Sequence, residues 1–355
     1  MPFGKGYAST FFMPRRMFSR HIPLLNSVNE SGLSPHSLPP QSAKHEGLAH
    51  AGDFSRNFPC ISVKKKEFTT MKKTVLSLML ALCLLLSSSI ALATTFTDAH
   101  GNEIELDDSL EAYTTVVLSG ADNAARKEET NLGDLWTDAL RWFAISGNIN
   151  AAFDEDDAAN GIDHLDVDAD HVVALWNGGN LRADIAEGKF GAAELAEVLP
   201  FPNKVAVVYM TGEQLAEALE AASQALPCTN ESADACASFM QVSGLVYTVD
   251  TTKEYDKGEA YGDLWYQANS VNRVTVESVN SQPFDAQALY AVVTSNANYN
   301  GMDSSYIFKA AAEANPHSAI TTAVVRDVVW QYIAEELNNQ VTDAYAAPQG
   351  RITVK

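Results

Sequence analysis

The chain has 355 residues, of which 46% are hydrophobic and 19% charged, which is enough for one sizeable hydrophobic core. Its formal net charge is −21, and residues 94–355 hold 13 Lys and Arg against 41 Asp and Glu. A surface of this charge repels polyanions, which argues against nucleic acid as a partner and predicts that an anionic ligand is held by locally concentrated arginines.

Residues 71–93 have the pattern of a secretory signal peptide. Two lysines follow Met71, the apolar run VLSLMLALCLLL comes next, and an Ala-Leu-Ala ending favours cleavage before Thr94. An uncleaved membrane anchor is the alternative, because the apolar run approaches spanning length. Residues 1–70, rich in Ser, Pro and His, are interpreted as a non-native or disordered extension. We therefore expect an exported protein, either periplasmic, extracellular or at the cell surface.

Residues 94–112 are expected to form a lead-in hairpin, because FTDAHGNEIEL alternates around a His-Gly-Asn turn. Residues 113–355 follow without a Pro-, Gly- or Ser-rich linker, which predicts one domain. Strand patterns lie at 114–118, 172–176, 205–210, 245–249, 271–279 and 289–294, and helical periodicity lies at 132–145, 192–199, 212–225 and 320–337. Their irregular alternation predicts an α+β fold of mixed α/β layers.

A glycine turn follows the predicted strand 172–176. The turn sequence Asn-Gly-Gly-Asn begins at Asn177, and its glycines, Gly178 and Gly179, permit backbone angles that side chains forbid. The turn delivers Arg182 to a strand end, where the guanidinium offers a planar fork of donors to phosphate or carboxylate oxygens. Arg182 is therefore a candidate anion-binding residue, with a salt bridge to one of the many acids as the structural alternative.

Five segments of the chain carry a family resemblance. They are ETNLGDLWTDAL at 129–140, WNGGNLR at 176–182, LPFPN at 199–203, FMQVSGLVYTVD at 239–250 and TSNANYNGMDSSY at 294–306. In this order they resemble the C-terminal, substrate-binding domain of the 5'-nucleotidase family. The resemblance covers about residues 113–355 and implies mixed sheets covered by helices.

The resemblance assigns the anionic part of a nucleotide to two arginines. It implies that Arg182 contacts phosphate or ribose, with Asn177, Gly178 and Gly179 shaping the turn. Arg126 matches a phosphate-contacting arginine of bacterial family members. Because acidic and basic residues follow Arg126 directly, an ordinary solvated charge cluster is an equal alternative.

The resemblance also implies contacts with the base and the sugar. Phe201 is expected to stack on the base, which is worth roughly 1 to 3 kcal/mol, and packing in the core is the alternative. A second ring of the family aligns with Ala297, and Tyr299 would replace it if this segment is extended. Asn177 and Asp303 are the expected contacts of the sugar hydroxyls.

Other positions of these motifs depart from the family or have structural explanations. Asn180, Met302 and the two serines after Asp303 stand where the family has glycine, which weakens the expectation of a standard purine nucleotide. Asn131 and Asp134 are expected to cap and begin the helix that follows, a role that needs no ligand.

Metal-dependent catalysis is not expected. Full 5'-nucleotidases hold two metals in a separate N-terminal domain, and no such domain is visible in this sequence. Asp98 and His100 match that domain's opening motif, but the partner motifs never follow, so we interpret the match as accidental. The acidic segment from Asp154 to Asp170 is a candidate for structural calcium, although it lacks EF-hand spacing and solvated carboxylates are the common alternative.

Cys228 and Cys236 are the only cysteines after the signal segment. In an exported protein we expect a disulfide between them, which would close a short loop and contribute roughly 2 to 3 kcal/mol. No histidine accompanies them at the spacing of a zinc site.

These patterns predict an exported binding module for a nucleotide, nucleoside or similar phosphorylated metabolite, without its own dinuclear metal centre. One alternative is a 5'-nucleotidase-like hydrolase of nucleotide catabolism that works with a separate metallophosphatase partner. Another is a surface interaction protein that keeps only the scaffold.

Overall fold

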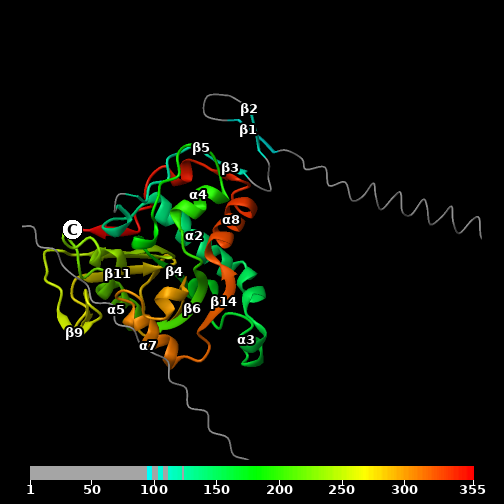
Figure 1. Ribbon diagram of the computed structural model, residues 1–355. Helices are drawn as coiled ribbons and strands as arrows, with labels where there is room; N and C mark the ends of the chain where they lie inside the picture. The colour runs from blue at the N-terminus through cyan, green and yellow to red at the C-terminus, as the bar shows by residue number, and fades with distance from the viewer. Residues whose placement is uncertain (1–93, 98–102, 107–110, 122–123) are drawn as a thin grey trace, which may run out of the picture. The chain divides into compact units, whose positions relative to one another are not determined.

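The computed structural model describes residues 94–355 apart from 98–102, 107–110 and 122–123 (Figure 1). The predicted signal segment, the extension before it, and the motif containing Asp98 and His100 lie outside the described residues.

The lead-in hairpin is present as an antiparallel pair of two strands, β1 (Thr94–Thr97) and β2 (Glu103–Leu106). In the described part of the chain, no helix is long and apolar enough to cross a membrane.

A five-stranded mixed sheet is the centre of the domain, with the strand order β14-β6-β13-β4-β7 (Figure 1). The strands are β4 (Val172–Asn177), β6 (Lys204–Thr211), β7 (Met240–Ser243), β13 (Leu289–Ser295) and β14 (Ala319–Val324). β13 and β4 run parallel, and the other neighbours run antiparallel. The valine-rich runs in these strands suit a sheet that is covered on both faces.

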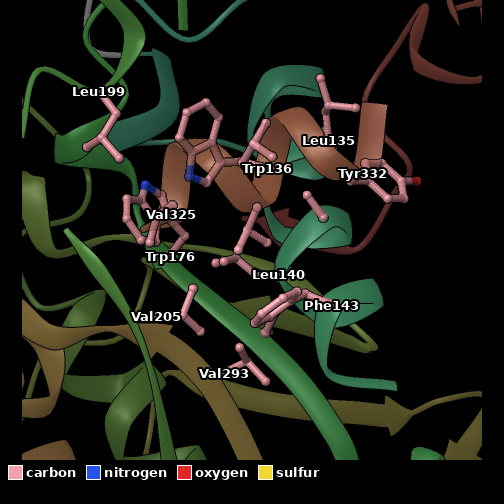
Figure 2. Packing of buried hydrophobic residues seen from close by; sticks show 14 of the residues in the cluster. Leu135, Trp136, Leu140, Phe143, Trp176, Leu199, Val205, Val293, Val325 and Tyr332 are labelled. Atoms are coloured by element: carbon pink, nitrogen blue, oxygen red, sulfur yellow. The ribbon is translucent and has the colours of Figure 1, made fainter. Parts of the chain in front are cut away.

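One face of this sheet packs against α2 (Asn131–Ile145), α4 (Ala192–Val198) and α8 (Val325–Glu335). Successive residues of β4 point to opposite faces, so Trp176 enters this core while Leu175 enters the other. Figure 2 shows Trp136 of α2 beside Trp176, and their ring centroids lie 6.1 Å apart.

The other face packs against α5 (Gly212–Ala222), α7 (Tyr306–Ala314) and a second sheet. That sheet has the order β12-β11-β8-β16. Its strands are β8 (Leu245–Val249), β11 (Val274–Val279), β12 (Gln282–Pro283) and β16 (Ile352–Val354). β16 pairs in parallel with β8, so the C-terminal strand lies at an edge of this sheet.

Shorter elements complete the domain. A small sheet joins β3 (Glu111–Thr114), β5 (Gly188–Gly191) and β15 (Gln340–Val341), and β9 (Lys257–Tyr261) pairs with β10 (Trp265–Ala268) in a hairpin. Two short helices are α3 (Glu155–Ala159) and α6 (Asn296–Tyr299). The 3-10 turns are η1 (Ala124–Arg126), η2 (Asn148–Ala152), η3 (Ala169–His171), η4 (Gly178–Asn180), η5 (Ala235–Ser238) and η6 (Asp343–Tyr345).

The predicted α+β fold of mixed layers is confirmed, but two predicted elements are wrong. Residues 320–337 do not form one helix, because Ala319–Val324 is strand β14 and the helix begins at Val325. The β-branched residues of this stretch pair with β6, and that pairing outweighs the helical periodicity. The strand predicted at 114–118 ends at Thr114, and beyond it Leu118 makes an isolated bridge with Ile185.

The core over α2 supplies a stability test. Leu140 is fully buried, whereas Ile145 at the end of the same helix is 41% exposed. We expect Leu140→Ala to lower the free energy of unfolding by about 2 to 5 kcal/mol, because it removes buried carbon and leaves a cavity. Ile145→Ala is the matched control and should cost under about 1 kcal/mol. Denaturant unfolding of both variants measures the difference, and equal costs would contradict this packing.

Candidate functional site

The candidate site begins where β4 ends, at the turn containing Gly178 and Gly179. A Cβ at residue 178 would lie 1.7 Å from the carbonyl oxygen of Ala125, and a Cβ at residue 179 would lie 2.5 Å from the Cβ of Ala237. Neither glycine has a positive φ, so the predicted need for unusual backbone angles is wrong. Glycine is required here because neighbouring segments leave no space for a side chain.

Gln241 of β7 joins the segment before α2 to the central sheet. Its fully buried side chain donates from Nε2 to the carbonyls of Ala125 at 2.9 Å and Glu128 at 2.8 Å, and its Oε1 accepts from the N–H of Thr130 at 3.0 Å. A Cβ at Gly133 would lie 2.2 Å from the same Oε1. Two motif segments, 129–140 and 239–250, therefore meet at one buried joint, together with the residues just before the first of them.

Arg182 and Phe201 lie together at the surface, as the sequence predicts. The central guanidinium carbon of Arg182 lies 5.6 Å from the centroid of the Phe201 ring. The N–H of Arg182 donates to the carbonyl of Val198 at 2.9 Å, which ties this segment to the end of α4, and Pro200 leads from there to Phe201. Phe201 is 41% exposed, so the alternative that it packs in the core is wrong.

The Arg182 guanidinium is exposed, and no residue in the described ranges forms a hydrogen bond or ion pair with it. Its donors are therefore open to a ligand. The alternative role of Arg182, a salt bridge to a neighbouring acid, does not occur among these residues.

Asp303 lies within electrostatic reach of both candidate arginines. Nδ2 of Asn177 donates to its Oδ2 at 3.3 Å. The residue has a φ of 56°, which is uncommon outside glycine but tolerated by Asp better than by most residues. Burial raises the pKa of the Asp303 carboxyl, while the positive charges of Arg126 and Arg182 oppose that rise. Asn177 and Asp303 are therefore in direct contact, and Arg126 and Arg182 both act on the same carboxyl through their charges.

Arg126 is held on one side by the loop before η5. Its Nη1 donates to the carbonyl of Ala233 at 2.7 Å and lies 3.9 Å from a carboxylate oxygen of Asp234, and its side chain is 12% exposed. Lys127 and Glu128 instead pair with each other at 3.9 Å. Arg126 is thus not part of a solvated charge cluster, and its charge acts on the Asp303 side of the site.

Tyr299 does not join this group in the way the sequence predicts. Residues 296–299 form α6, so Ala297 and Tyr299 do not share the parity of an extended strand. The Tyr299 hydroxyl donates to the carbonyl of Ser318 at 3.2 Å, and the ring packs against the core formed with α7. The helix therefore turns this ring toward a core contact and overturns the parity argument.

Two buried polar atoms near the site were missed by sequence reasoning. Oδ1 of Asn203 and Oγ of Ser304 have no hydrogen-bond partner among the described residues, although both residues are more than nine-tenths buried. Asn203 lies two residues after Phe201 and Ser304 follows Asp303. Asn203 is the last residue of the motif LPFPN, so its place in that motif was the signal that could have marked it as a candidate site residue.

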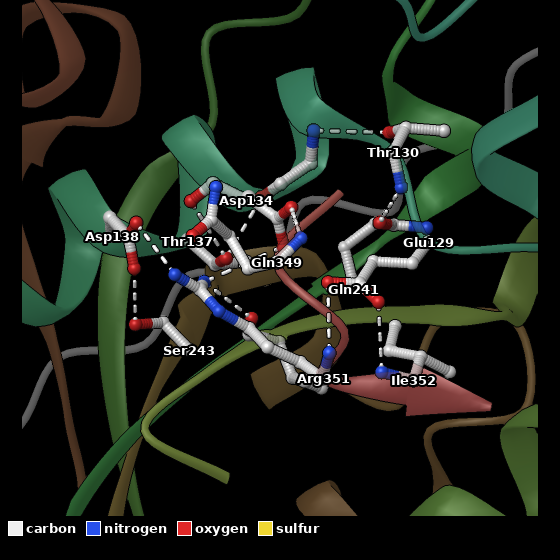
Figure 3. A network of polar contacts seen from close by, with 12 residues as sticks. Glu129, Thr130, Asp134, Thr137, Asp138, Gln241, Ser243, Gln349, Arg351 and Ile352 are labelled. Carbon is white, nitrogen blue, oxygen red and sulfur yellow. Dashed lines mark hydrogen bonds and ion pairs between the residues drawn. The ribbon is translucent and has the colours of Figure 1, made fainter. Parts of the chain in front are cut away.

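A network of acids beside α2 holds the C-terminal strand (Figure 3). The Glu129 carboxylate accepts from the N–H groups of Arg351 and Ile352, each at 3.0 Å. The Arg351 guanidinium lies 2.8 Å from Oδ2 of Asp138 and 3.6 Å from Oδ1 of Asp134. Part of the ETNLGD motif therefore fixes β16 rather than a ligand.

The cap of α2 also differs from the prediction. Asn131 begins the helix, but Thr130 is the N-cap, and its hydroxyl accepts from the N–H of Gly133 at 3.1 Å. The Asn131 amide instead donates to the carbonyls of Val117 and Tyr345, at 2.9 and 2.8 Å. The predicted capping role of Asn131 and Asp134 is therefore wrong.

The carboxylates from Asp154 to Asp170 do not gather into the predicted calcium site. Asp154 caps α3, while Asp163, Asp166 and Asp168 pair with His164, His317 and His171, respectively. Within the described ranges, no group of three His, Cys, Asp or Glu side chains could hold a metal ion. Because each of these acids interacts with a different partner, they do not form one cluster of carboxylates around a cation.

Cys228 and Cys236 are both free thiols, so the predicted disulfide is not formed in this structure and stays a prediction. The Cys236 sulfur contacts the Ser232 hydroxyl and the Ala225 carbonyl, each at 3.6 Å. Burial and the neighbouring Cys228 thiol raise the pKa of Cys236 to about 12, so it stays a neutral thiol.

A groove of about 650 Å³ lies between the Cys228 segment and β16. Lys127, Glu129, Pro227 and Val354 contribute to its walls. None of the predicted ligand-binding residues lines it, so this hollow and the converging polar groups are separate features.

Residues 111–313 match the family model described as 5'-nucleotidase, C-terminal domain. The chain is 28% identical over 218 residues to the trifunctional nucleotide phosphoesterase protein YfkN of Bacillus subtilis (strain 168), a match covering 61% of this chain and 12% of YfkN. It is 30% identical over 192 residues to the cell wall protein Lmo0130 of Listeria monocytogenes, covering 52% of this chain and 19% of that protein.

Among solved structures, the chain is similar to a 5'-nucleotidase precursor from Thermus thermophilus, with 28% identity and a TM-score of 0.48. This match covers 69% of the chain and 39% of that structure. The chain thus spans less than two-fifths of the length of each of these three relatives.

The acid network predicts how stability depends on pH. Burial, and secondarily the Glu129 carboxylate, raise the pKa of Asp134 to about 8, against the opposing charge of Arg351. The folded protein therefore keeps a proton that the unfolded chain releases above about pH 4. The stability this proton provides is complete below that pH and is lost as the pH rises through about 8.

We expect Asp134→Asn to raise the free energy of unfolding at pH 8 and to reduce the stability difference between pH 5 and pH 8 by at least about 1 kcal/mol. Asn keeps the acceptor for the Gln349 N–H and cannot ionise, and Arg351 keeps Asp138 as its partner. Asp234→Asn, at a side chain 93% exposed, is the matched control and should leave the pH dependence unchanged. Denaturant unfolding across pH measures this, and a curve parallel to wild type for Asp134→Asn would contradict it.

Proposed function

Because the chain belongs to the 5'-nucleotidase C-terminal domain family, we propose that it is an exported module that binds a nucleotide or nucleoside and does not hydrolyse it alone. The single observation that carries this proposal is the open Arg182 guanidinium 5.6 Å from the exposed Phe201 ring. A cationic fork beside a flat apolar face matches a ligand that has both an anionic group and a base.

The anionic part of the ligand is assigned to Arg182, with Arg126 as a second positive charge. Charge-assisted hydrogen bonds to phosphate are about twice as strong as neutral ones, and a guanidinium makes them in pairs. The exposed guanidinium of Arg182 supports the direct role. Arg126, which already donates to Ala233, contributes through its remaining donors and its charge.

The base is assigned to the free face of Phe201, and the sugar to Asn177 and Asp303. Stacking on an aromatic ring tolerates different bases, because every base has a flat face. Tyr299 is engaged with Ser318, so we propose a contact on one face of the base rather than a clamp of two rings. This favours low selectivity among bases.

Binding without hydrolysis is proposed because the described residues contain no group of acids, histidines and cysteines able to hold a metal ion. Hydrolysis of a phosphate ester by two metals needs such a group to fix the cations and the attacking water. A hydrolase that works with a separate metallophosphatase partner is the second candidate, and it is supported by the name of YfkN, a nucleotide phosphoesterase.

Export is part of the proposal. It is supported by the signal-peptide pattern of residues 71–93 and by the name of one relative, the cell wall protein Lmo0130.

Ligand binding by variants tests the assigned roles. We expect Arg182→Met to weaken AMP binding about tenfold or more and to affect adenosine less, because only AMP carries the phosphate. Phe201→Leu should weaken both ligands about tenfold, because both lose the stacking face. Lys253→Met removes one exposed cation on the β8 side of the molecule and is the control. Isothermal titration measures the affinity of the wild type and the three variants for AMP and adenosine. An affinity for AMP that is unchanged in Arg182→Met supports the scaffold-only alternative.

Phosphate release separates the binding module from the hydrolase. We expect the purified protein, supplied with manganese or zinc, to release no more phosphate from AMP than a blank without protein. If phosphate is released and Arg182→Met abolishes the release, the protein is a hydrolase and the binding-only proposal is wrong.

A further inference from the structure

The hairpin of β9 and β10 touches both loops that complete the candidate site. It forms a sheet of its own, and all its strand residues are at least partly exposed. A hairpin of two strands is marginally stable by itself, so its position depends on its side-chain contacts. Tyr261 and Trp265 are directly opposite in the register, so their side chains leave the same face of the hairpin.

Tyr261 holds the loop that carries Asp303. Its hydroxyl donates to the carbonyl of Gly301 at 2.6 Å, two residues before Asp303. Gly301 has a φ of 81°, and a Cβ there would lie 2.5 Å from the same hydroxyl oxygen. The Tyr261 ring also packs against Tyr306, with centroids 5.6 Å apart. The path of this loop is therefore set by contact with the hairpin.

Trp265 holds the loop that carries the partners of Arg126. Its Nε1 donates to the carbonyl of Ala235 at 3.1 Å. The two residues before Ala235 supply the carbonyl and carboxylate beside the Arg126 guanidinium. Ala237, two residues after it, packs against Gly179 of the turn. One indole hydrogen bond thus fixes the segment between Arg126 and the glycine turn.

We propose that Tyr261 and Trp265 are positioning residues, and that the hairpin is a strap holding the two halves of the ligand site in place. Tyr261 sets the Asp303 side, which is assigned to the sugar, and Trp265 sets the Arg126 side, which is assigned to the phosphate. The ligand consequence rests on the proposed function, whereas the restraint of the two loops does not.

The test uses Tyr261→Phe and Trp265→Phe, which remove one donor each and keep an aromatic ring. Tyr290→Phe is the matched control. Tyr290 lies at the start of β13, and its hydroxyl also donates to a backbone carbonyl, that of Asp285. Hydrogen–deuterium exchange on the ligand-free proteins reports each loop, and isothermal titration with AMP and adenosine reports binding.

We expect Tyr261→Phe to speed exchange in residues 297–305 and to weaken AMP and adenosine alike, by about three- to tenfold. Trp265→Phe should speed exchange in residues 229–237. It should weaken the binding of AMP by a similar factor and change the affinity for adenosine by less than about twofold. A general loss of stability would instead speed exchange in both loops in each variant and would weaken the binding of AMP and adenosine equally.

The outcomes distinguish the strap from the proposed function. If each variant speeds exchange only in its own loop but the wild-type protein binds neither AMP nor adenosine, the strap is supported and the proposed function is overturned. The strap is overturned if Tyr261→Phe and Trp265→Phe bind both ligands as wild type does and neither speeds exchange in its own loop. It is also overturned if Tyr290→Phe produces the same exchange changes as these two variants.

Discussion

The contact between the Ala125 carbonyl and the backbone of Gly178 is the constraint on which the site depends. The oxygen occupies the place where a side chain at residue 178 would begin. Arg126 directly follows that carbonyl, and Arg182 follows the turn that starts at residue 178. Two segments far apart in the sequence therefore pack closely, and the arginines that follow them both act on the Asp303 carboxyl through their charges.

Two positive charges near the same site repel each other, and a negative charge within reach of both offsets that repulsion. Asp303 supplies that charge, and its Asn177 contact holds the carboxylate at the end of β4. Burial acts against the ionised carboxylate and the arginines favour it, so the three groups depend on one another. In a chain with a large excess of acids, these arginines are the positive charges to which the proposed function assigns an anionic ligand.

The sequence predicted three central strands (β4, β6 and β13), α2, and the meeting of Arg182 with Phe201, because each follows from a local pattern or from the order of the motifs. It did not predict the short strand β7. Nor did it predict β14, where pairing with β6 decides the conformation of β-branched residues that also fit a helical period. It also misplaced Tyr299, since a single turn of helix reverses the side that the ring faces. The role of Asp134 depends on Arg351, which lies over 200 residues away, and no local pattern reveals such a pair.

The motif residues divide into two sets with different physical roles. Gln241, Gly133 and Gly178 are buried and set how segments pack, so their presence speaks for the fold. Arg182 and Phe201 are exposed and contribute little to packing, so their proximity is what speaks for a ligand. The departures at Ala297 and Met302 fall at positions that are partly or fully exposed, whereas those at Ser304 and Ser305 are buried. The buried set therefore carries the packing of the fold, whereas the proposed ligand role rests on the exposed pair Arg182 and Phe201.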